Sequence, residues 1–429
     1  MKVWLRKCWA LLLLAVACVA LLSTWSAKPK SPPFHVGLPL PQGVVAPQLL
    51  AHADLIVLLA PDGSLWIWGG GDLGSHFSIL GTPTAPLVPQ RVGTDTDWRR
   101  VATSGHGILG IRADGSLWAF GYDDGHALLQ APSKGTIHTP YRIGAETNWV
   151  EVSSDSSHVL ALKRDGSLWS WGNNWAGQVG VGNTVNTILA ITQVGADADW
   201  KSIVCGRASS YALKWDGSLW AWGCEAVGNN SIALSPTLFD PATNWASIVP
   251  DDFHVMGLRT DGTLWSFGMA PFNLRRTAFA QVGTDTNWQE VVTGRNLIFA
   301  RKADRSWWVC GENNGRFGSA SAPAGATTPV KLGFALSVWA MAASSRSVVV
   351  LAPDGRLWTW GRRPGATARF GAFAPVLAPV NKLAESWLGR GLFYPEPPID
   401  ETPQLIWELP SSVKAALNTN APSQPKFAP

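Results

Sequence analysis

A nine-residue phrase recurs along this chain and constrains its fold more than any other feature. The third copy reads RDGSLWSWG at residues 164–172. Close copies lie at 61–69, 113–121, 215–223, 260–268 and 353–361, and a more divergent copy lies at 303–311. The steps between copies are 52, 51, 51, 45, 43 and 50 residues. Self-similarity at such a period indicates an array of units that share one structure. A glycine marks each copy, with Arg305 in its place in the sixth: Gly63, Gly115, Gly166, Gly217, Gly262 and Gly355.

A tryptophan that lies 16 residues before the aspartate of the phrase supports the same period. Five copies carry it, as Trp98, Trp149, Trp200, Trp245 and Trp288. The first and seventh copies have Ala46 and Val338 at this position. A core of constant length between spacers of variable length is typical of a structural repeat rather than of a catalytic motif.

The third copy shows the local structure that each unit is expected to form. Residues 149–152, 158–163 and 167–172 are three strand-like runs, and the segment 192–195 predicts a fourth strand. Asp165-Gly166 predicts a tight two-residue turn with positive φ at both central positions. Four antiparallel strands in each unit of about 50 residues, seven times over, predict an all-β, seven-bladed β-propeller with four-stranded blades.

The phrase itself fits a blade that is covered on both faces. Leu168 is expected to face one side of the sheet, while Trp169 and Trp171 face the other, and neighbouring blades cover both. We therefore interpret the tryptophans as packing residues rather than as ligand contacts. Positive φ is unfavourable for arginine, so Arg305 predicts a different or longer turn in the sixth blade.

The segments outside the repeats suggest the domain organisation. Residues 1–27 begin with positive charge and continue into an apolar stretch, as in a removable export signal or a membrane anchor helix. Either form would place the rest of the chain outside the cytoplasm, in the periplasm or on the outer face of the cytoplasmic membrane. Residues 28–45 predict a Pro-rich linker, 46–387 the propeller and 388–429 a Pro-rich tail. Within that tail, QLIWEL at 404–409 is a candidate strand to close the ring.

The charge distribution argues against a nucleic-acid partner. Lys2, Arg6 and Lys7 lie in the N-terminal segment, and removing these three positive charges from the formal net charge of +4 leaves +1. The remaining sequence has no cluster of Lys and Arg that could track a phosphate backbone.

Three cysteines follow the N-terminal segment, and their odd number leaves at least one thiol unpaired. Cys310 stands where most copies have the second aromatic residue, so we expect a buried small side chain. Cys205 and Cys224 are expected at one end of a blade with a strand between them, which is too far for a disulfide. No Cys/His spacing resembles a zinc site, and neither a metal nor a cofactor is expected.

The third copy, HVLALKRDGSLWSWGNNWAGQVGVG, resembles the repeat of the regulator of chromosome condensation family. The resemblance covers residues 46–387, although the Gly-Gln-hydrophobic-Gly tail is clear only at 177–180. It implies a seven-bladed propeller. The eukaryotic namesake of the family exchanges nucleotide on a small nuclear GTPase, whereas the export signal here favours comparison with exported bacterial members. One such member grips β-lactamases with loops at one end of its channel. The resemblance therefore implies a protein-binding role without naming the partner.

The blade ends are the expected binding regions, because loops on a rigid scaffold carry function. The turn between the first two strands should lie at the same end as the loop after the phrase. The residues seven or eight positions before the aspartate of each phrase copy form a candidate channel rim: Asp54, His106, His158, Ser209, His254, Asn296 and Arg346. A histidine at this position can also serve to stabilise the turn, and that alternative stays open.

The loops after the phrase contain aromatic and cationic residues of the types that are enriched in binding hot spots. The candidates for contact with a partner are Tyr122, His126, Trp175, Phe272, Arg275, Arg276, Arg316, Phe317, Arg362 and Arg363.

Catalytic motifs are missing from the sequence: it has no nucleophile elbow, no phosphate-binding loop and no His-Glu-x-x-His. We therefore expect an exported, envelope-associated, monomeric propeller that binds an unknown protein through its loop face and is not an enzyme. The alternative is a glycan-binding module or a hydrolase or lyase that uses the channel mouth. Guanine nucleotide exchange is a third and more distant hypothesis.

Overall fold

The computed structural model describes residues 45–410 with gaps at 53–54, 71–85, 87, 106, 124–126, 130–135, 156–157, 225–231, 252–253, 270–274, 295, 314–315, 319–324, 333–337, 345 and 363–398. The described residues form seven antiparallel sheets of four strands each, as the sequence predicts. The expected N-terminal helix and the linker before residue 45 lie outside the described residues. Within the described residues there is no helix long and apolar enough to span a bilayer.

Each sheet is one blade, and its strands follow one another in chain order. Blade 1 contains β1 (Gln48–His52), β2 (Leu55–Leu59), β3 (Leu65–Gly69) and β4 (Gln90–Arg91). Blade 2 contains β5 (Trp98–Ser104), β6 (Gly107–Arg112), β7 (Leu117–Gly121) and β8 (Ile137–Ile143). Blade 3 contains β9 (Trp149–Ser154), β10 (His158–Lys163), β11 (Leu168–Asn173) and β12 (Thr187–Gln193). Blade 4 contains β13 (Trp200–Cys205), β14 (Ser209–Lys214), β15 (Leu219–Cys224) and β16 (Ile232–Asp240).

The remaining three blades repeat the same order. Blade 5 contains β17 (Trp245–Pro250), β18 (His254–Arg259), β19 (Leu264–Met269) and β20 (Arg275–Gln281). Blade 6 contains β21 (Trp288–Gly294), β22 (Leu297–Lys302), β23 (Trp307–Glu312) and β24 (Gly325–Lys331). Blade 7 contains β25 (Ala340–Ala343), β26 (Ser347–Leu351), β27 (Arg356–Arg362) and β28 (Ile399–Glu408).

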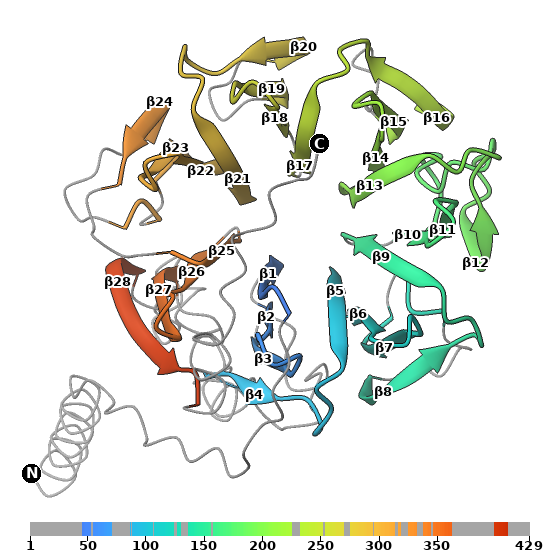
Figure 1. The fold of residues 1–429 in the computed structure, drawn as a ribbon, viewed down its shortest axis with the longest axis horizontal. Coiled ribbons are helices and arrows are strands. Elements are labelled where there is room, and N and C mark those ends of the chain that lie inside the picture. Colours follow the sequence, from blue (N-terminus) through green and yellow to red (C-terminus); the bar gives the residue numbers. More distant parts are fainter. Residues whose placement is uncertain are drawn as a thin grey trace, which may run out of the picture. The chain divides into compact units, whose positions relative to one another are not determined.

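The first strands of the blades lie side by side around a common axis, as Figure 1 shows. β1 of the first blade contacts β25 of the seventh, so the ring is closed. The candidate closing strand at 404–409 is confirmed, since β28 pairs antiparallel with β27 and aligns Glu408 with Arg356. The fourth strand of the third blade covers residues 187–193, earlier than the segment 192–195 that the sequence suggests.

The turn inside the phrase differs from the prediction. Gly166 N donates to Lys163 O (2.9 Å) and Lys163 N donates to Ser167 O (3.1 Å), so three residues form the loop. Positive φ in this turn belongs to Gly166 (82°) and not to Asp165. The glycine is also needed for space, because a Cβ there would lie 2.1 Å from Ala198 O. A type I turn followed by a left-handed residue is the usual three-residue hairpin.

The prediction of a different turn at Arg305 is wrong. Arg305 N donates to Lys302 O (2.9 Å) and Lys302 N donates to Ser306 O (3.0 Å), as in the other blades. Arg305 itself adopts the left-handed conformation, with φ of 67°. The hydrogen bonds and the pairing of β22 with β23 hold this backbone in place, and they outweigh the moderate strain of a non-glycine residue at positive φ.

The phrase tryptophans have two separate roles. Trp171 is fully buried and its Nε1 donates to Ala127 O (2.7 Å) in the preceding blade, while Leu168 packs toward the following blade. Trp222 and Trp360 make the equivalent bonds, to Gln178 O and Arg316 O. The second tryptophan therefore joins blades, as expected, whereas the first, such as Trp169, lies nearer the phrase turn and is only partly buried against the same cluster.

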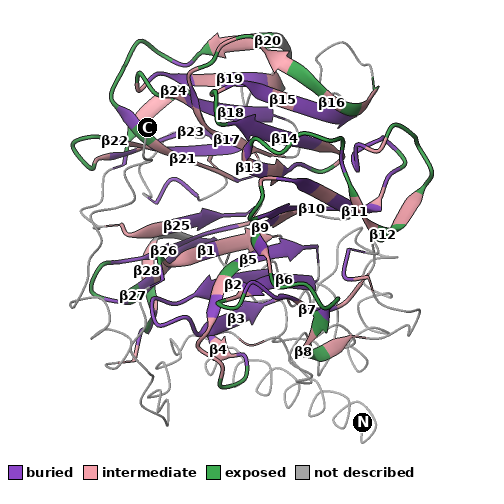
Figure 2. Ribbon diagram, turned by 45° about the vertical axis from the view of Figure 1, so that its right-hand side comes forward, coloured by how far each residue is buried: buried purple, intermediate pink, exposed green. Residues whose placement is uncertain are grey.

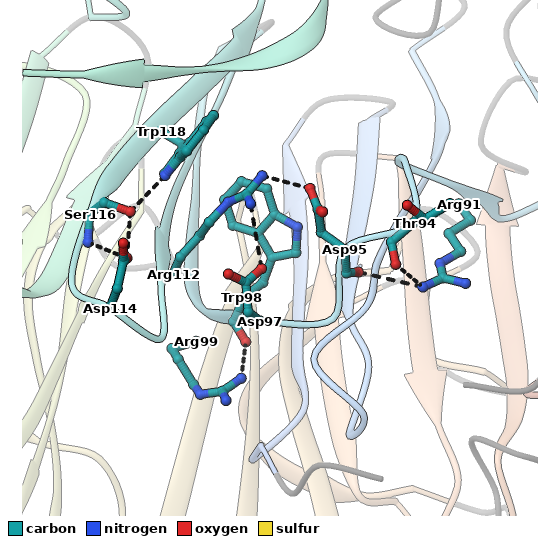
Figure 3. Close-up of polar contacts among 10 residues, drawn as sticks. All are labelled: Arg91, Thr94, Asp95, Asp97, Trp98, Arg99, Arg112, Asp114, Ser116 and Trp118. Carbon is teal, nitrogen blue, oxygen red and sulfur yellow. Dashed lines mark hydrogen bonds and ion pairs between the residues drawn. The ribbon is translucent and has the colours of Figure 1, made fainter. Parts of the chain in front are cut away.

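The first phrase tryptophan belongs to a polar cluster at the turn end, which we define as the end of the blades that carries the phrase turns. In blade 2 the Arg112 guanidinium lies 4.6 Å from the Trp98 ring and 4.0 Å from the Trp118 ring, and pairs with Asp95 (Figure 3). Ser116 Oγ donates to Asp114 Oδ1 (2.5 Å) and accepts from Trp118 Nε1 (2.7 Å). We call this arrangement a cation sandwich; blades 3 to 6 repeat it with Lys163, Lys214, Arg259 and Lys302.

None of the three described cysteines forms a disulfide. Cys205 and Cys224 lie on β13 and β15 with β14 between them, so the prediction that they form no disulfide is confirmed. Cys310 is buried as expected, and this burial raises the pKa of its thiol to about 12.

Candidate functional site

The best-defined loop at the opposite end, which we call the loop end, connects β11 with β12 in blade 3 (Figure 1). Asn174 organises it from a fully buried position: its backbone N donates to Asn186 O (2.8 Å) and its Nδ2 donates to Asn183 O (2.9 Å). Asn174 Oδ1 also accepts from Val179 N (3.0 Å). One buried residue thus fixes three points of the loop, two through its side-chain amide and one through its backbone.

Blade 4 supports the same loop from the side. Gly182 N donates to Leu234 O (2.8 Å) on β16, and Gln178 O accepts from Trp222 Nε1 (2.9 Å). Gly180 has a φ of 83°, and a Cβ there would lie 2.6 Å from Trp222 Nε1. The Gly-Gln-Val-Gly segment is therefore a contact between blades, and its glycines allow the close approach.

His158 completes this support beneath the loop. Its side chain is fully buried, and its Nε2 lies 2.8 Å from Ser210 Oγ, which in turn donates to Gln178 O (2.7 Å). Because Ser210 donates its proton to the carbonyl, His158 must donate from Nε2. Burial lowers the pKa of His158 to about 4, so the ring is neutral at pH 7. This histidine connects blade 3, blade 4 and the loop.

Large apolar side chains are exposed on this supported region. Trp175 is 53% exposed between the buried residues Asn174 and Ala176, while Val185 and Leu189 are 58% and 64% exposed. Ile232, at the start of β16, is 48% exposed. We call Trp175, Val185, Leu189 and Ile232 the loop surface; Figure 2 shows exposed segments along β12 and β16 and the loop beside them.

The loop surface is also free of charge over a long stretch. Residues 173–193 contain no Asp, Glu, Lys or Arg in 21 consecutive positions. The core of a protein interface is depleted of charged residues and enriched in aromatic ones. The composition and the rigid support are together those of a docking surface for another macromolecule.

Comparison with known families matches the same part of the chain. Sequence models of the regulator of chromosome condensation (RCC1) repeat match residues 149–178 and 165–213. These matches lie within blades 3 and 4, and the same four-stranded architecture recurs in all seven blades. The chain is a seven-bladed propeller that contains RCC1-type repeats.

Curated relatives match only part of this chain. The ultraviolet-B receptor UVR8 of Arabidopsis thaliana is 30% identical over 201 residues, which cover 45% of this chain and 44% of the receptor. The mitochondrial RCC1 domain-containing protein RUG3 of Arabidopsis thaliana is 30% identical over 179 residues, 39% of each chain. The chain thus spans less than half the length of these curated relatives.

Two solved structures share the fold over most of their length. The structure of Prp20p from Saccharomyces cerevisiae has a TM-score of 0.64 at 16% identity, covering 84% of this chain and 88% of that one. Human WBSCR16 has a TM-score of 0.63 at 16% identity, covering 80% of this chain and 94% of that one. Identities at this level show the propeller fold alone.

The structure separates the loop candidates of the RCC1-repeat propeller into three groups. Trp175 is exposed and Tyr122 is half-buried, so both are accessible. Arg316 and Phe317 are buried at 2% exposure each, and the expectation that they face solvent is wrong. The reason is that Arg316 NH1 donates to Ser344 O (3.0 Å) and Arg316 O accepts from Trp360, so this loop packs onto blade 7.

The remaining loop candidates cannot be placed as side chains. Arg275 and Arg276 begin β20 and Arg362 ends β27, with only their backbone described. His126, Phe272 and Arg363 lie outside the described residues.

The candidate channel rim is only partly at the surface. His158 and His254 are buried at 0% and 2% exposure, which argues against an open ligand site, and the His158 ring bonds Ser210 of blade 4 rather than its own turn. Burial lowers the pKa of His254 to about 4 as well. Ser209, Asn296 and Arg346 are half-buried, and Asp54 and His106 lie outside the described residues. Over the described residues, no group of three or more His, Cys, Asp and Glu is placed to hold a metal ion.

Sequence reasoning did not select Val185, Leu189 and Ile232, which complete the loop surface. The uncharged run at 173–193 was a signal that could have found the first two. It also did not select Trp215, which is 66% exposed at the turn end. Trp215 stands where other phrase copies have Pro, Ala, Arg or Thr, so its departure from the repeat was visible.

Proposed function

We propose that this RCC1-repeat propeller is an exported protein-interaction module that binds its partner through the loop surface of blades 3 and 4. The observation that carries the proposal is Trp175, which is 53% exposed while its chain neighbours Asn174 and Ala176 are fully buried. A large aromatic side chain held in solvent by a rigid, hydrogen-bonded loop has no role in packing the propeller. It is the usual anchor of a protein–protein contact.

The rigidity of the loop supports the proposal energetically. Binding is weakened when side chains and loops must become ordered, by about 0.5 to 1.5 kcal/mol for each flexible side chain. Here the hydrogen bonds of Asn174 and the contact of Gly182 with β16 order the backbone before any partner arrives. The apolar side chains of Val185 and Leu189 then add contact area with little further cost of ordering the loop.

The relatives support protein binding in general terms. The work on Prp20p describes its binding to Gsp1p and histones, and a second structure shows Kap60 bound to the yeast RCC1 protein. Those partners belong to those proteins. For this chain the proposed partner differs, because export through residues 1–27 would separate it from nuclear proteins.

The export half of the proposal has its own test. Protease added to intact cells should digest the full-length chain once any outer barrier is opened, while a variant that begins at residue 28 should stay protected inside. Equal protection of both chains would contradict export.

Site-directed photocrosslinking tests the interaction half. A photoreactive amino acid at Leu189, in the loop surface, should give a discrete protein adduct in the cells that produce the chain. The matched control is the same amino acid at Arg164, an exposed residue at the turn end of the same blade. Absence of an adduct at 189, or adducts of equal yield at both positions, would overturn the assignment of this surface.

A further inference from the structure

The junction between the seventh and first blades differs from the others in the residues that form it. Blades 2 to 6 each hold a Lys or Arg between two tryptophans. Blade 1 has Ala46 in place of the preceding tryptophan and Ala60 in place of the cation. Trp66 is nevertheless retained, and its Nε1 donates to Ser64 Oγ (2.8 Å) as in the other blades.

The missing partner of Trp66 comes from the other end of the chain. The ring of Trp407, on β28 of blade 7, lies 4.9 Å from the ring of Trp66, with the ring planes 51° apart. In blade 3, the corresponding pair is Trp149 and Trp169, whose ring centroids lie 6.2 Å apart. Trp66 is 1% exposed and Trp407 is 5% exposed, so the contact buries both rings.

The backbone that follows Trp407 repeats a feature of the ordinary junctions. Trp98 N donates to Gly63 O and Trp149 N donates to Gly115 O, where the chain passes from one blade to the next. At the seventh blade, Leu409 N donates to Gly355 O (2.6 Å). The segment therefore makes the two contacts that the chain makes where it passes between other blades. It bonds to the phrase turn of one blade, here blade 7, and it covers the phrase tryptophan of the next, here blade 1.

We propose that residues 399–409 act as a separable ligand strand, bound to a site that the edge of β27 forms together with the face of Trp66 that Trp407 covers. The site takes an extended segment that pairs with β27 and carries an indole two residues before the amide that bonds Gly355. This proposal concerns ring closure and does not depend on the interaction function proposed above.

The connection to β28 suits a strand that binds as a separate unit. Residues 363–398 place 36 positions between β27 and β28, whereas 174–186 place 13 between β11 and β12. Because the link is long, the strand can leave and return without rearranging β27. One part of the binding site, the Trp66 ring, lies on blade 1, so occupancy by β28 stabilises a blade that is about 340 positions away in sequence.

Cleavage of the full-length protein tests whether the strand is a ligand. A protease recognition sequence placed between residues 363 and 398 allows the chain to be cut after folding. The C-terminal fragment should co-elute with the propeller, and a large excess of a synthetic peptide of residues 399–409 should displace it. A peptide with Trp407→Ala should displace it at least tenfold less well. A fragment that dissociates at once, or that no peptide displaces, would overturn the proposal.

Hydrogen exchange on the uncut protein provides a second, independent readout. Trp407→Ala should accelerate amide exchange at least tenfold in β28 and also in β3 of blade 1. The matched control is Leu405→Ala, on the same strand with its side chain 41% exposed, which should leave β3 unchanged. If Trp407→Ala does not fold, Trp407→Phe retains an aromatic ring and should give a smaller acceleration at the same two strands. Unchanged exchange in β3 for every folded Trp407 variant would contradict the contact between the blades.

Discussion

The two ends of the propeller use the same residue types in opposite ways. At the turn end, Trp118 and Trp169 lie against Arg112 and Lys163, and this cluster recurs in five successive blades. At the loop end, Trp175 has no equivalent in the phrase and faces solvent. Repetition within the chain thus marks residues that stabilise blades, while departure from the repeat marks residues that are available to a partner.

The largest difference is expected between two tryptophans that lie four positions apart. Trp171→Ala should lower the free energy of unfolding by about 4 kcal/mol, because it empties a buried site and breaks the bond to Ala127 O. Trp175→Ala should change it by less than about 0.5 kcal/mol, since the side chain is half in solvent. Urea unfolding of both variants measures this, and equal losses would remove the distinction between the two roles.

Acid is expected to weaken the loop end through His158. Its pKa is about 4 when folded against an ordinary value of 6.5, so the unfolded chain takes up a proton first. The stability from neutral His158 is therefore lost as pH falls from 6.5 to 4, by up to about 3 kcal/mol. His158→Gln should reduce this slope in urea unfolding measured from pH 7 to pH 4; an unchanged slope would contradict the buried neutral ring.

Glu151 provides a control, because its pKa shift should change stability in the opposite direction as pH falls. Burial raises its pKa to about 7 from an ordinary 4.5, although the charge of Arg100 acts against this rise. The folded protein then takes up the proton first, so this group adds stability as pH falls from 7 to 4.5. Glu151→Gln should remove that gain, and the slope toward acid should become steeper than in the wild type.

A smaller effect is expected at the turn end from Lys163. Its Nζ lies 3.6 Å from the Trp169 ring and 2.8 Å from Glu146 Oε1, and the side chain is largely buried. Lys163→Ala should lower the free energy of unfolding by about 2 kcal/mol. Lys201→Ala, whose Nζ lies 5.7 Å from the exposed Trp215 ring, should lower it by about 0.5 kcal/mol or less. Denaturant midpoints of both variants, measured at low and high salt, would show which substitution costs more stability. A larger loss for Lys201→Ala than for Lys163→Ala would contradict the prediction.

The smallest effect should come from the phrase turn that has Arg305 in place of glycine. Arg305→Gly should raise the free energy of unfolding by about 0.5 kcal/mol, because glycine relieves the positive φ but loses more backbone entropy. Gly166→Ala, by contrast, places a Cβ 2.1 Å from Ala198 O and should be clearly destabilising. A loss of stability in Arg305→Gly would show that the arginine side chain contributes to the blade.

The repeat made most of the fold predictable, since the phrase and its spacing indicate the strands and the order of the blades, while the closing strand at 404–409 was suggested by a separate apolar run outside the repeats. The turn geometry was not predictable from Asp165-Gly166 alone, because the same dipeptide suits loops of two and three residues. The burial of Arg316 and Phe317 depends on contacts with Ser344 and Trp360, which are far apart in sequence. Exposure is a tertiary property, and residue type alone could not separate Trp175 from Phe317.

The most direct test of the account compares two exposed tryptophans, Trp175 and Trp215, in the crosslinking experiment. With the photoreactive amino acid at Leu189, Trp175→Ala should abolish the adduct, because it removes the proposed anchor from the loop surface. Trp215→Ala, at the turn end, should leave the adduct yield unchanged. An adduct that survives Trp175→Ala, or that both substitutions reduce equally, would contradict the claim that binding resides at the loop end.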